Sequence, residues 1–432
     1  MRLDQLLTGM NKILGVTDVQ SAFEIVSFAF FLRKCELNGL EACKEQYSLS
    51  YLSLIYGERM TDTDLFNYCA ELENELGIKD RLISESLINA LRRVSISQIV
   101  RDIFDSVYSA SNDPDVNIAE LYDAVLDSYQ DMAGRNAGEF GGNRSLAKLE
   151  GALLNAKDNC SIYDGYCGMA TSIVEAGNNT NKFYIRDMML PVLSKAVINL
   201  YIHDRPIESA LCGDSNIFDG KKYDYIISEP PFSIKRDLDY MRSVDPEGHI
   251  KSRESLEVER MIEALKDNGR AVILVPAGIL FSMSSLKDFR EALLQSRHVE
   301  TIVGLKPGAV MGSMVSAMLL VIDKSKEFDN ILMVDTSDAW EGNRGRVMKI
   351  SQKNIDKISE IVRNRQIKDN ISVLISLEEI RNNALNMTPA MYVHPYNIKD
   401  VEVADISALI LKSKQLTEEL GAVSKKLEDL RS

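Results

Sequence analysis

Residues 161–177 read SIYDGYCGMATSIVEAG, in which a short apolar run ends in Asp164. A turn with Gly165 and Gly168 follows, and a helical pattern begins near Ala170. A glycine turn between a strand and a helix lets backbone N–H groups approach a ligand at the N-terminus of the helix. Ordinary strand-to-helix turns also use glycine, and this one lacks a GxG pattern. The stretch alone therefore predicts a strand–turn–helix unit, and a ligand site only together with further motifs.

Short apolar runs alternate with helical patterns on both sides of this unit. The runs lie at 160–164, 182–187, 223–228, 270–276, 299–305, 317–323 and 330–336. Helix-like stretches separate the first four runs, which is the rhythm of a mostly parallel, doubly wound sheet. The last three runs follow one another closely, so we expect that end of the sheet to be mixed or antiparallel.

Acidic residues follow the strands that come after this turn. Asp187 ends the run at 182–187, where a carboxylate can accept hydrogen bonds from both hydroxyls of a ribose. Asp214 lies in LCGDSNIF, on a short loop where it can accept from an adenine amino group. A single acid at such a position is more often a helix cap or a surface group, but several at successive strand ends favour a ligand site.

The run at 223–228 leads directly into Glu229-Pro230-Pro231-Phe232. Two successive prolines fix the backbone φ angle and remove two N–H donors, which predicts a rigid, extended turn at the carboxyl end of the strand. We expect Phe232 to project its ring into the crevice where open α/β sheets bind ligands.

The ends of the chain differ in character from the sheet region. Residues 1–130 show helical periodicity at 19–37, 48–57, 63–77 and 81–95, which predicts a helical packing or docking domain, with Thr61 or Thr63 capping the third helix. The glycine-rich stretch 131–147 reads as a linker or a mobile loop. We expect an α/β domain over 131–400 and a helix over 401–432.

Apolar residues from Ile406 onward recur at steps of three and four, the pattern of a coiled-coil seam. Two interpretations stay open: a single helix packed on its own domain, and an intermolecular coiled coil that makes a homodimer or a hetero-oligomer.

Composition limits the function classes. The net charge of −14 excludes a general-purpose polyanion binder, because binding DNA through its phosphates needs local Lys/Arg clusters. No stretch approaches the roughly 20 apolar residues of a membrane span, and the N-terminus lacks the apolar region of a signal peptide. The six cysteines show no CxxC pair and there are four histidines, so we expect no metal site and a cytoplasmic location.

Together these motifs carry a family resemblance. The chain resembles the N6-adenine DNA methyltransferases, specifically the modification subunit of type I restriction–modification systems, from about residue 10 to the C-terminus. IYDGYCGMAT (162–171) stands where that family has Asp-Pro-Ala-Cys-Gly-Thr-Gly-Gly, and EPPF (229–232) stands at its Asn-Pro-Pro-Phe motif. SFAFFLRK (27–34) is similar to its N-terminal helical segment. Later segments are matched by 269–282, 299–325 and 385–393.

The resemblance implies a Rossmann-like, S-adenosylmethionine-dependent methyltransferase domain with an N-terminal helical domain and a C-terminal coiled-coil-like helix. It implies DNA as substrate, reached through a separate specificity subunit. It implies cofactor-binding roles for Asp164, Cys167, Gly168, Asp187 and Asp214, and catalytic roles for Glu229, Pro230, Pro231 and Phe232. In the family, the asparagine accepts hydrogen bonds from the amino group of a flipped adenine, and the aromatic ring stacks on the base.

Three departures from the family pattern fall at this site. Glu229 replaces the asparagine, and displacements of about 1 Å at a reacting centre can cost roughly a hundredfold in rate. Ala170 replaces a glycine, and its Cβ is expected to crowd the methionine moiety of the cofactor. Phe140-Gly141-Gly142-Asn143 stands where a Tyr-Thr-Pro segment is expected.

Two hypotheses therefore remain: an adenine methyltransferase that works within a complex, and a catalytically inactive methyltransferase fold kept as a DNA-binding or assembly subunit. A free-standing small-molecule methyltransferase fits the Pro-Pro-Phe turn and the terminal seam poorly.

Overall fold

The computed structural model describes residues 19–43, 47–94, 96–133, 142–213, 220–232, 252–282, 286–342 and 348–394. The chain divides into two compact units, one up to Val393 and one from His394 onward. The predicted helix over 401–432 lies outside the described residues, and so do its seam, Asp214, Phe140 and Gly141.

The first part of the chain is helical, as its periodicity predicted. Its helices are α2 (Val19–Leu37), α3 (Leu49–Ile55), α4 (Asp62–Glu75), α5 (Leu82–Val94), α6 (Ser97–Ser111) and α7 (Ile118–Ala133). Thr61 caps α4: its side chain accepts from the Asp64 N–H, while the Asp64 carboxylate accepts from the Thr61 N–H. The sequence pattern found α2 to α5 and missed α6 and α7.

The predicted linker over 131–147 is wrong at both of its ends. Helix α7 continues to Ala133, and α8 (Arg144–Leu154) begins well before residue 147. The side chain of Asn143 accepts from the Ser145 N–H at 3.0 Å and so caps α8. Arg144 forms an ion pair with Asp123 of α7. These two contacts stabilise the start of α8. The glycines before it had led to the prediction of a linker.

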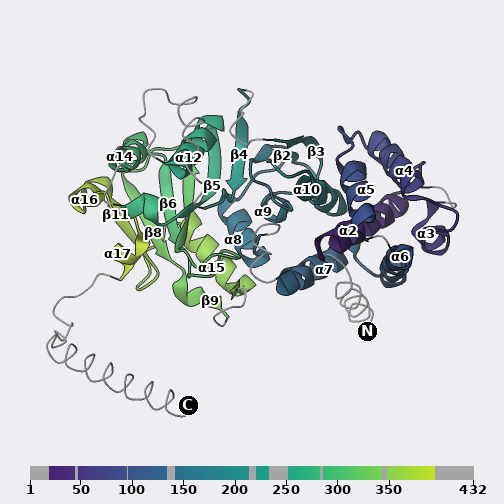
Figure 1. The fold of residues 1–432 in the computed structure, drawn as a ribbon. Helices are drawn as coiled ribbons and strands as arrows, with labels where there is room; N and C mark the ends of the chain where they lie inside the picture. The colour runs from purple at the N-terminus through teal and green to yellow at the C-terminus, as the bar shows by residue number, and fades with distance from the viewer. Residues whose placement is uncertain are drawn as a thin grey trace, which may run out of the picture. The chain divides into compact units, whose positions relative to one another are not determined.

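A nine-stranded sheet forms the rest of the unit (Figure 1). Its strands are β1 (Ser161–Asp164), β2 (Lys182–Asp187), β3 (Ile207–Cys212), β4 (Tyr223–Ser228), β5 (Leu265–Pro276), β6 (Val299–Gly304), β7 (Ala317–Asp323), β8 (Asn330–Asp335) and β11 (Ser372–Ser376). They lie in the order β11-β8-β6-β7-β5-β4-β1-β2-β3. A two-stranded pair of β9 (Trp340–Glu341) and β10 (Lys349–Ile350) follows a short 3-10 turn, η3 (Ser337–Ala339).

The strand directions confirm the predicted mixed sheet, which is parallel in its first part and contains antiparallel strands in its second. Strands β1 to β5 pair in parallel, whereas β7 runs antiparallel between β5 and β6, and β11 is antiparallel to β8. The sequence pattern missed β3 and β11, and it began β5 at Arg270 rather than Leu265. Edge strand β3 is half-exposed along its length, so it lacks the continuous apolar run that marked the buried strands.

Alternate residues of the strands enter two separate hydrophobic clusters, one on each face of the sheet. In β5, Val272 and Leu274 belong to one cluster, and Ile273 and Val275 to the other. The first face is covered by α8, α9 (Thr171–Ala176), α10 (Leu190–Ile202) and α15 (Gln352–Arg363). The second is covered by α12 (Arg253–Ala264), α13 (Gly278–Phe281), α14 (Lys287–Ser296), α16 (Leu377–Asn382) and α17 (Pro389–Val393).

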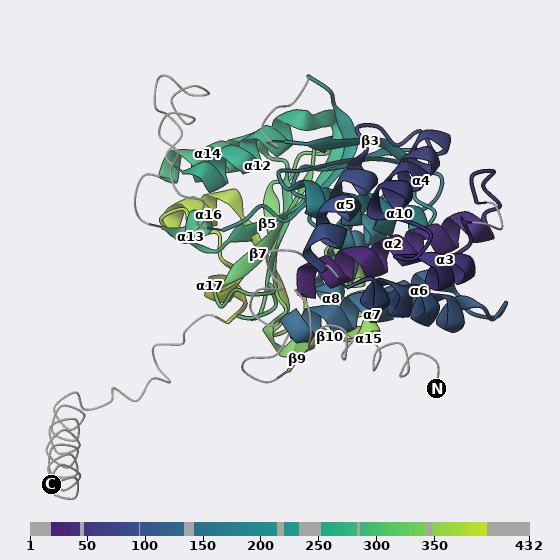
Figure 2. The same ribbon diagram turned by 45° about the vertical axis from the view of Figure 1, so that its right-hand side comes forward.

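The N-terminal helices pack on the sheet region through α10, which lies beside α2 and α5 (Figure 2). A buried ion pair joins Lys195 of α10 to Glu24 of α2 at 3.4 Å. The rings of Phe31 and Tyr201 meet edge to face, with centroids 5.4 Å apart. One hydrophobic cluster runs through both regions, so the division of the chain at residue 130 stays a prediction. None of the described helices is long and apolar enough to cross a membrane.

Candidate functional site

The candidate site lies where the strand order reverses, because β1 has β4 on one side and β2 on the other. In open α/β sheets, ligands bind outside the carboxyl ends of the strands at such a point. Asp164 ends β1, Asp187 ends β2, and Glu229 follows the last residue of β4. The structure therefore brings these three predicted site residues to one edge of the sheet.

Asp187 holds the turn that follows β1. Its Oδ2 accepts from the Gly168 N–H at 3.1 Å and its Oδ1 from the Met189 N–H at 2.9 Å. Burial raises the pKa of this half-buried carboxyl, and the N–H groups partly offset the effect. Gly168 has a φ of +52°, and no atom lies within 4 Å of the position that a Cβ would take. The turn thus presents a carboxylate beside open space.

Asp164 has an internal role. Its side chain is buried, and its Oδ1 accepts from the Tyr166 N–H at 3.0 Å and from the Ser228 hydroxyl at 2.8 Å. Burial raises the pKa of Asp164 to about 7. These bonds tie the end of β1 to the end of β4, so Asp164 shapes the crevice from inside the protein.

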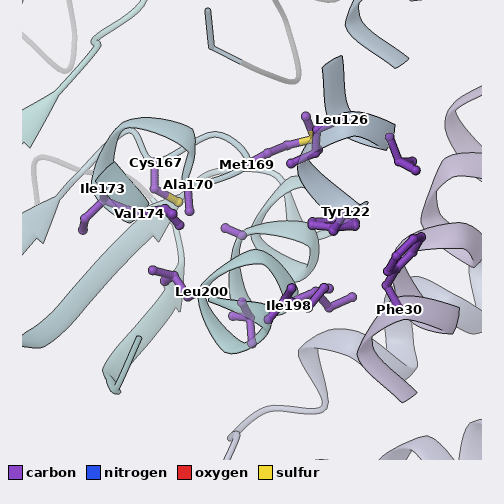
Figure 3. Packing of buried hydrophobic residues seen from close by; sticks show 14 of the residues in the cluster. Phe30, Tyr122, Leu126, Cys167, Met169, Ala170, Ile173, Val174, Ile198 and Leu200 are labelled. Carbon is purple, nitrogen blue, oxygen red and sulfur yellow. The ribbon is translucent and has the colours of Figure 1, made fainter. Parts of the chain in front are cut away.

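Cys167 and Ala170 are packing residues. Both side chains are buried in the larger cluster, next to Met169 and Ile173 (Figure 3). The Cys167 N–H donates to the Arg186 carbonyl at 3.1 Å. Ala170 adopts a left-handed conformation with a φ of +62° at the start of α9. Its methyl group is not exposed to a ligand, so the structure gives no support to the expected crowding of a cofactor.

The same cluster connects the turn after β1 to the N-terminal helices. Figure 3 shows side chains of α10, α7 and α2 that extend from the turn outward; they include Leu200, Ile198, Tyr122, Leu126 and Phe30. The position of the turn therefore depends on packing from a region more than a hundred residues earlier in the chain.

The Glu229–Phe232 turn makes contacts with the interior of the protein. Pro230 is buried and Pro231 is exposed. Phe232 is half-buried and packs against the larger cluster. The Ser172 hydroxyl, in the first turn of α9, donates to Oε1 of Glu229 at 2.5 Å. The Glu229 side chain is thus held by a residue that the sequence reasoning did not single out.

Glu150 of α8 is the second residue that the sequence reasoning missed. Its side chain is fully buried, and neither carboxyl oxygen has a hydrogen-bond donor among the described residues. Burial and the nearby Glu229 raise the pKa of Glu150, and burial raises the pKa of Glu229; the Ser172 hydroxyl, within reach of both carboxyls, partly offsets each shift. Within RSLAKLEGALL (144–154), Glu150 shares the apolar face of Leu146 and Leu153, and an acid on that face was the available signal.

The segment that stands in place of the family's Tyr-Thr-Pro also lies near Glu229, through its residue Gly142. A Cβ on Gly142 would lie 3.1 Å from Oε1 of Glu229, so a larger residue at 142 would require the carboxyl to shift by a few tenths of an ångström. Asn143 is buried, and its amide donates to the carbonyls of Ala309 and Met348, each at 2.8 Å. Gly142 and Asn143 therefore have structural roles at the rim of the site.

The residues at the turn fit a cofactor that carries ribose hydroxyls. Asp187 accepts hydrogen bonds from the backbone N–H groups of Gly168, Met189 and Met188, and a carboxylate has about four acceptor sites, so one stays available for a ligand. Gly168, whose N–H bonds to this carboxylate, has open space where a Cβ would stand. Asp164 and Cys167 contribute only through the shape of the turn. In the part of the chain that the structure describes, no three His, Cys, Asp or Glu side chains gather as a metal site would require.

The fold and the site define a mixed α/β protein with three acidic residues at the switch point of its sheet. The family model described as N-6 DNA Methylase matches residues 113–401, and the chain belongs to this family.

Curated relatives agree with the family match. The chain is 24% identical to the type I restriction enzyme MjaVII methylase subunit of Methanocaldococcus jannaschii over 69% of its own length and 59% of that protein. It is 20% identical to the MpnII methylase subunit of Mycoplasma pneumoniae over 72% of its own length and 63% of that protein. The chain thus spans less than two thirds of these relatives.

A solved structure shares the fold. The methyltransferase subunit of a type I restriction–modification system from Streptococcus thermophilus superposes with a TM-score of 0.65 at 17% identity. The match covers 90% of this chain and 98% of that chain.

Proposed function

We propose that the chain is a modification subunit of the N6-adenine class in a restriction–modification complex, and that it binds S-adenosylmethionine. Its N-terminal helical domain (1–130) would support a Rossmann-like methyltransferase domain (131–400), and residues 401–432 would serve subunit association. The observation that carries this proposal is the Gly168 turn held by Asp187, at the same sheet edge as the Glu229–Phe232 turn. Relatives described as methylase subunits of type I restriction enzymes support it.

In this proposal the chain's own residues bind and orient the cofactor. Asp187 would accept from the ribose hydroxyls, and the backbone around Gly168 would approach the cofactor closely. Asp214 would contact the adenine. When bound, S-adenosylmethionine supplies an activated methyl group. Pro230 and Phe232 would border the position of a flipped base.

DNA would be reached through a separate specificity subunit, because the acidic chain has few clusters of Lys and Arg. The association would use the helix over 401–432, as a hetero-oligomer or a homodimer. All six cysteines are free thiols, in keeping with a reducing, cytoplasmic location.

The cofactor proposal is tested by calorimetry with S-adenosylmethionine on the full chain, alone and with its co-expressed partner. Charge-assisted hydrogen bonds contribute roughly 1.5–3 kcal/mol. Asp187→Ala should therefore weaken binding about tenfold or more.

Asp335 offers a matched control. It also ends a strand, β8, and its Oδ1 accepts from the Ser337 N–H at 2.8 Å, but it lies in the other half of the sheet. Asp335→Ala should leave the affinity unchanged. No heat with millimolar cofactor in either preparation would refute the cofactor site.

A second candidate is favoured by one specific contact. Because Glu229 is bonded to Ser172 and adjoins Glu150, its carboxyl is engaged inside the protein. The chain would then be a catalytically inactive methyltransferase fold that serves as a DNA-binding or assembly subunit.

Methyl transfer distinguishes the two candidates. Labelled-methyl transfer to DNA is measured with the partner present, for wild type and for Glu229→Asn. If the chain is a catalytically inactive methyltransferase fold, wild type should transfer no methyl groups and Glu229→Asn should show measurable transfer. Wild-type transfer that the asparagine slows would show instead that Glu229 works in catalysis.

A further inference from the structure

The most unusual polar group in the described part of the protein is the carboxyl of Glu150. The residue has 0% exposure, and neither of its oxygens has a donor among the described residues. An isolated carboxylate is very unfavourable in such a place, and in practice a buried acid takes up a proton instead. We therefore expect the Glu150 carboxyl to carry a proton in the folded chain.

The Glu229 carboxyl lies within hydrogen-bonding reach of Glu150. Two carboxylates cannot bond to each other, because both are acceptors only. If one carries a proton, it becomes a donor and the contact turns into a short, charge-assisted hydrogen bond. The Ser172 hydroxyl also lies within reach of Glu150, but it has a single proton, which it donates to Glu229, so a proton shared between the two carboxyls satisfies both.

The other charged groups near the pair do not offer an alternative. Asp164 at the end of β1 faces both glutamates and adds negative charge, and Asp187 lies beyond it. Among the described residues no Lys, Arg or His forms an ion pair with Glu150 or Glu229. Lys195 acts on Asp187, but it is paired with Glu24.

We propose that Glu150 is a positioning residue: it holds one proton that it shares with Glu229, and it thereby fixes the Glu229–Phe232 turn against α8 and α9. Glu229 then accepts from two inward donors, the Ser172 hydroxyl at 2.5 Å and the Glu150 carboxyl. The missing side chain at Gly142 leaves the space that this arrangement needs. The inference goes beyond the proposed function, since it holds whether or not the chain transfers methyl groups.

The shared proton makes stability depend on pH with a defined sign. The unfolded chain loses the proton of Glu150 at a pKa of about 4.3, whereas the folded chain keeps it to a higher pH. The stability that this group contributes is therefore complete below about pH 4 and is lost as the pH rises toward its folded pKa. One proton changes the folding equilibrium constant about tenfold per pH unit over that interval.

The test compares wild type with Glu150→Gln by urea unfolding at each pH from 5 to 8. The amide of the variant still donates to Glu229 but cannot ionise. The ratio of folding constants, variant over wild type, should rise about tenfold per pH unit over the interval in which Glu150 keeps its proton only when folded. A ratio that stays flat with pH would overturn the proposal, since Glu150 would then titrate equally in both states.

Glu73 is the matched control. It is equally buried, but its carboxyl accepts from the Ile83 N–H, the Ser84 N–H and the Ser84 hydroxyl. Glu73→Gln should weaken folding near neutral pH, where Glu150→Gln should not. Equal losses in the two variants would overturn the proposal. If Glu150→Gln fails to fold, Glu229→Gln takes its place: removing one of the two negative charges should flatten the pH dependence, and an unchanged dependence would count against a shared proton.

Discussion

The helical region and the crevice of the sheet treat buried charge in opposite ways. In the helices, Glu73 is surrounded by three donors, at 2.6 Å, 3.2 Å and 2.6 Å. Glu24 is met by Lys195 and by the Ser86 hydroxyl. In the crevice, Glu150 has no donor within the described residues, and Asp164 and Glu229 add further acids.

This difference separates two reasons for burying an acid. A carboxylate that is fully hydrogen-bonded can be kept for the structure that it organises, such as the start of α5 by Glu73. A carboxyl without donors opposes folding at neutral pH, so its presence in the crevice has to be explained by the site. The following predictions test the comparison in order of the expected effect.

The largest effect is expected where the two regions meet. Lys195→Met leaves Glu24 buried without its cation, and removing one partner of a buried pair costs about 3–5 kcal/mol. The measurement is the free energy of unfolding in urea. Lys34→Met is the matched control on the same interface: its partner Asp204 is 63% exposed, so the loss should stay below about 1 kcal/mol. Similar losses in both would mean that burial does not set the strength of these pairs.

A smaller loss is expected inside the helical region. Glu73→Gln removes the charge that three donors surround, and it points an amide N–H₂ toward one of them. Hydrogen bonds to charged groups contribute roughly 1.5–3 kcal/mol, so we expect a loss of about 2 kcal/mol at pH 7. Thermal unfolding monitored by circular dichroism gives the readout. An unchanged unfolding temperature would show that Glu73 is already protonated, and the contrast with Glu150 would disappear.

The smallest effect is expected at Asp164, and it has the opposite sign. Burial raises its pKa to about 7, above the value of about 3.9 in an unfolded chain. Its contribution to stability is therefore complete below about pH 4 and is lost as the pH rises through about 7. The Oδ1 of an asparagine can accept from both Tyr166 and Ser228, so Asp164→Asn keeps both bonds.

We expect the stability of Asp164→Asn relative to wild type to rise by about 1 kcal/mol between pH 5 and pH 6, because only the wild-type carboxyl must keep a proton in the folded chain over this interval. A relative stability that falls between these pH values would show that the Asp164 carboxylate is needed in its ionised form.

The predictions from the sequence were most accurate for strands that end in an acid or are followed directly by one. Strands β2, β4 and β7 begin and end at the predicted residues, because apolar and aromatic residues bounded by polar ones have few alternatives. The missed strands β3 and β11 lie at the two edges of the sheet, where only part of each strand is buried. Strands that neighbours cover on both faces are rich in apolar residues, so the sequence pattern detected them. The edge strands are less covered and less apolar, so it did not.

The candidate site was predicted in outline only. Asp187 lies at the end of β2 and Glu229 directly after β4, as the sequence predicted. Glu150 was not found, because its significance comes from the contact with Glu229 across the fold and from the lack of any donor. A periodic pattern shows which face of a helix is apolar, but it does not show which distant residue an acid on that face will meet.

Gly142 restricts the order in which this site can change over evolutionary time. A side chain at this position would begin 3.1 Å from Oε1 of Glu229, a separation that forces one of the two groups to move. Replacing Glu229 by a shorter residue first would open room for a larger residue at 142, whereas the reverse order passes through a crowded intermediate. We therefore expect the two positions to change together: a lineage that carries the glutamate would gain a side chain at 142 more readily after losing that glutamate than before.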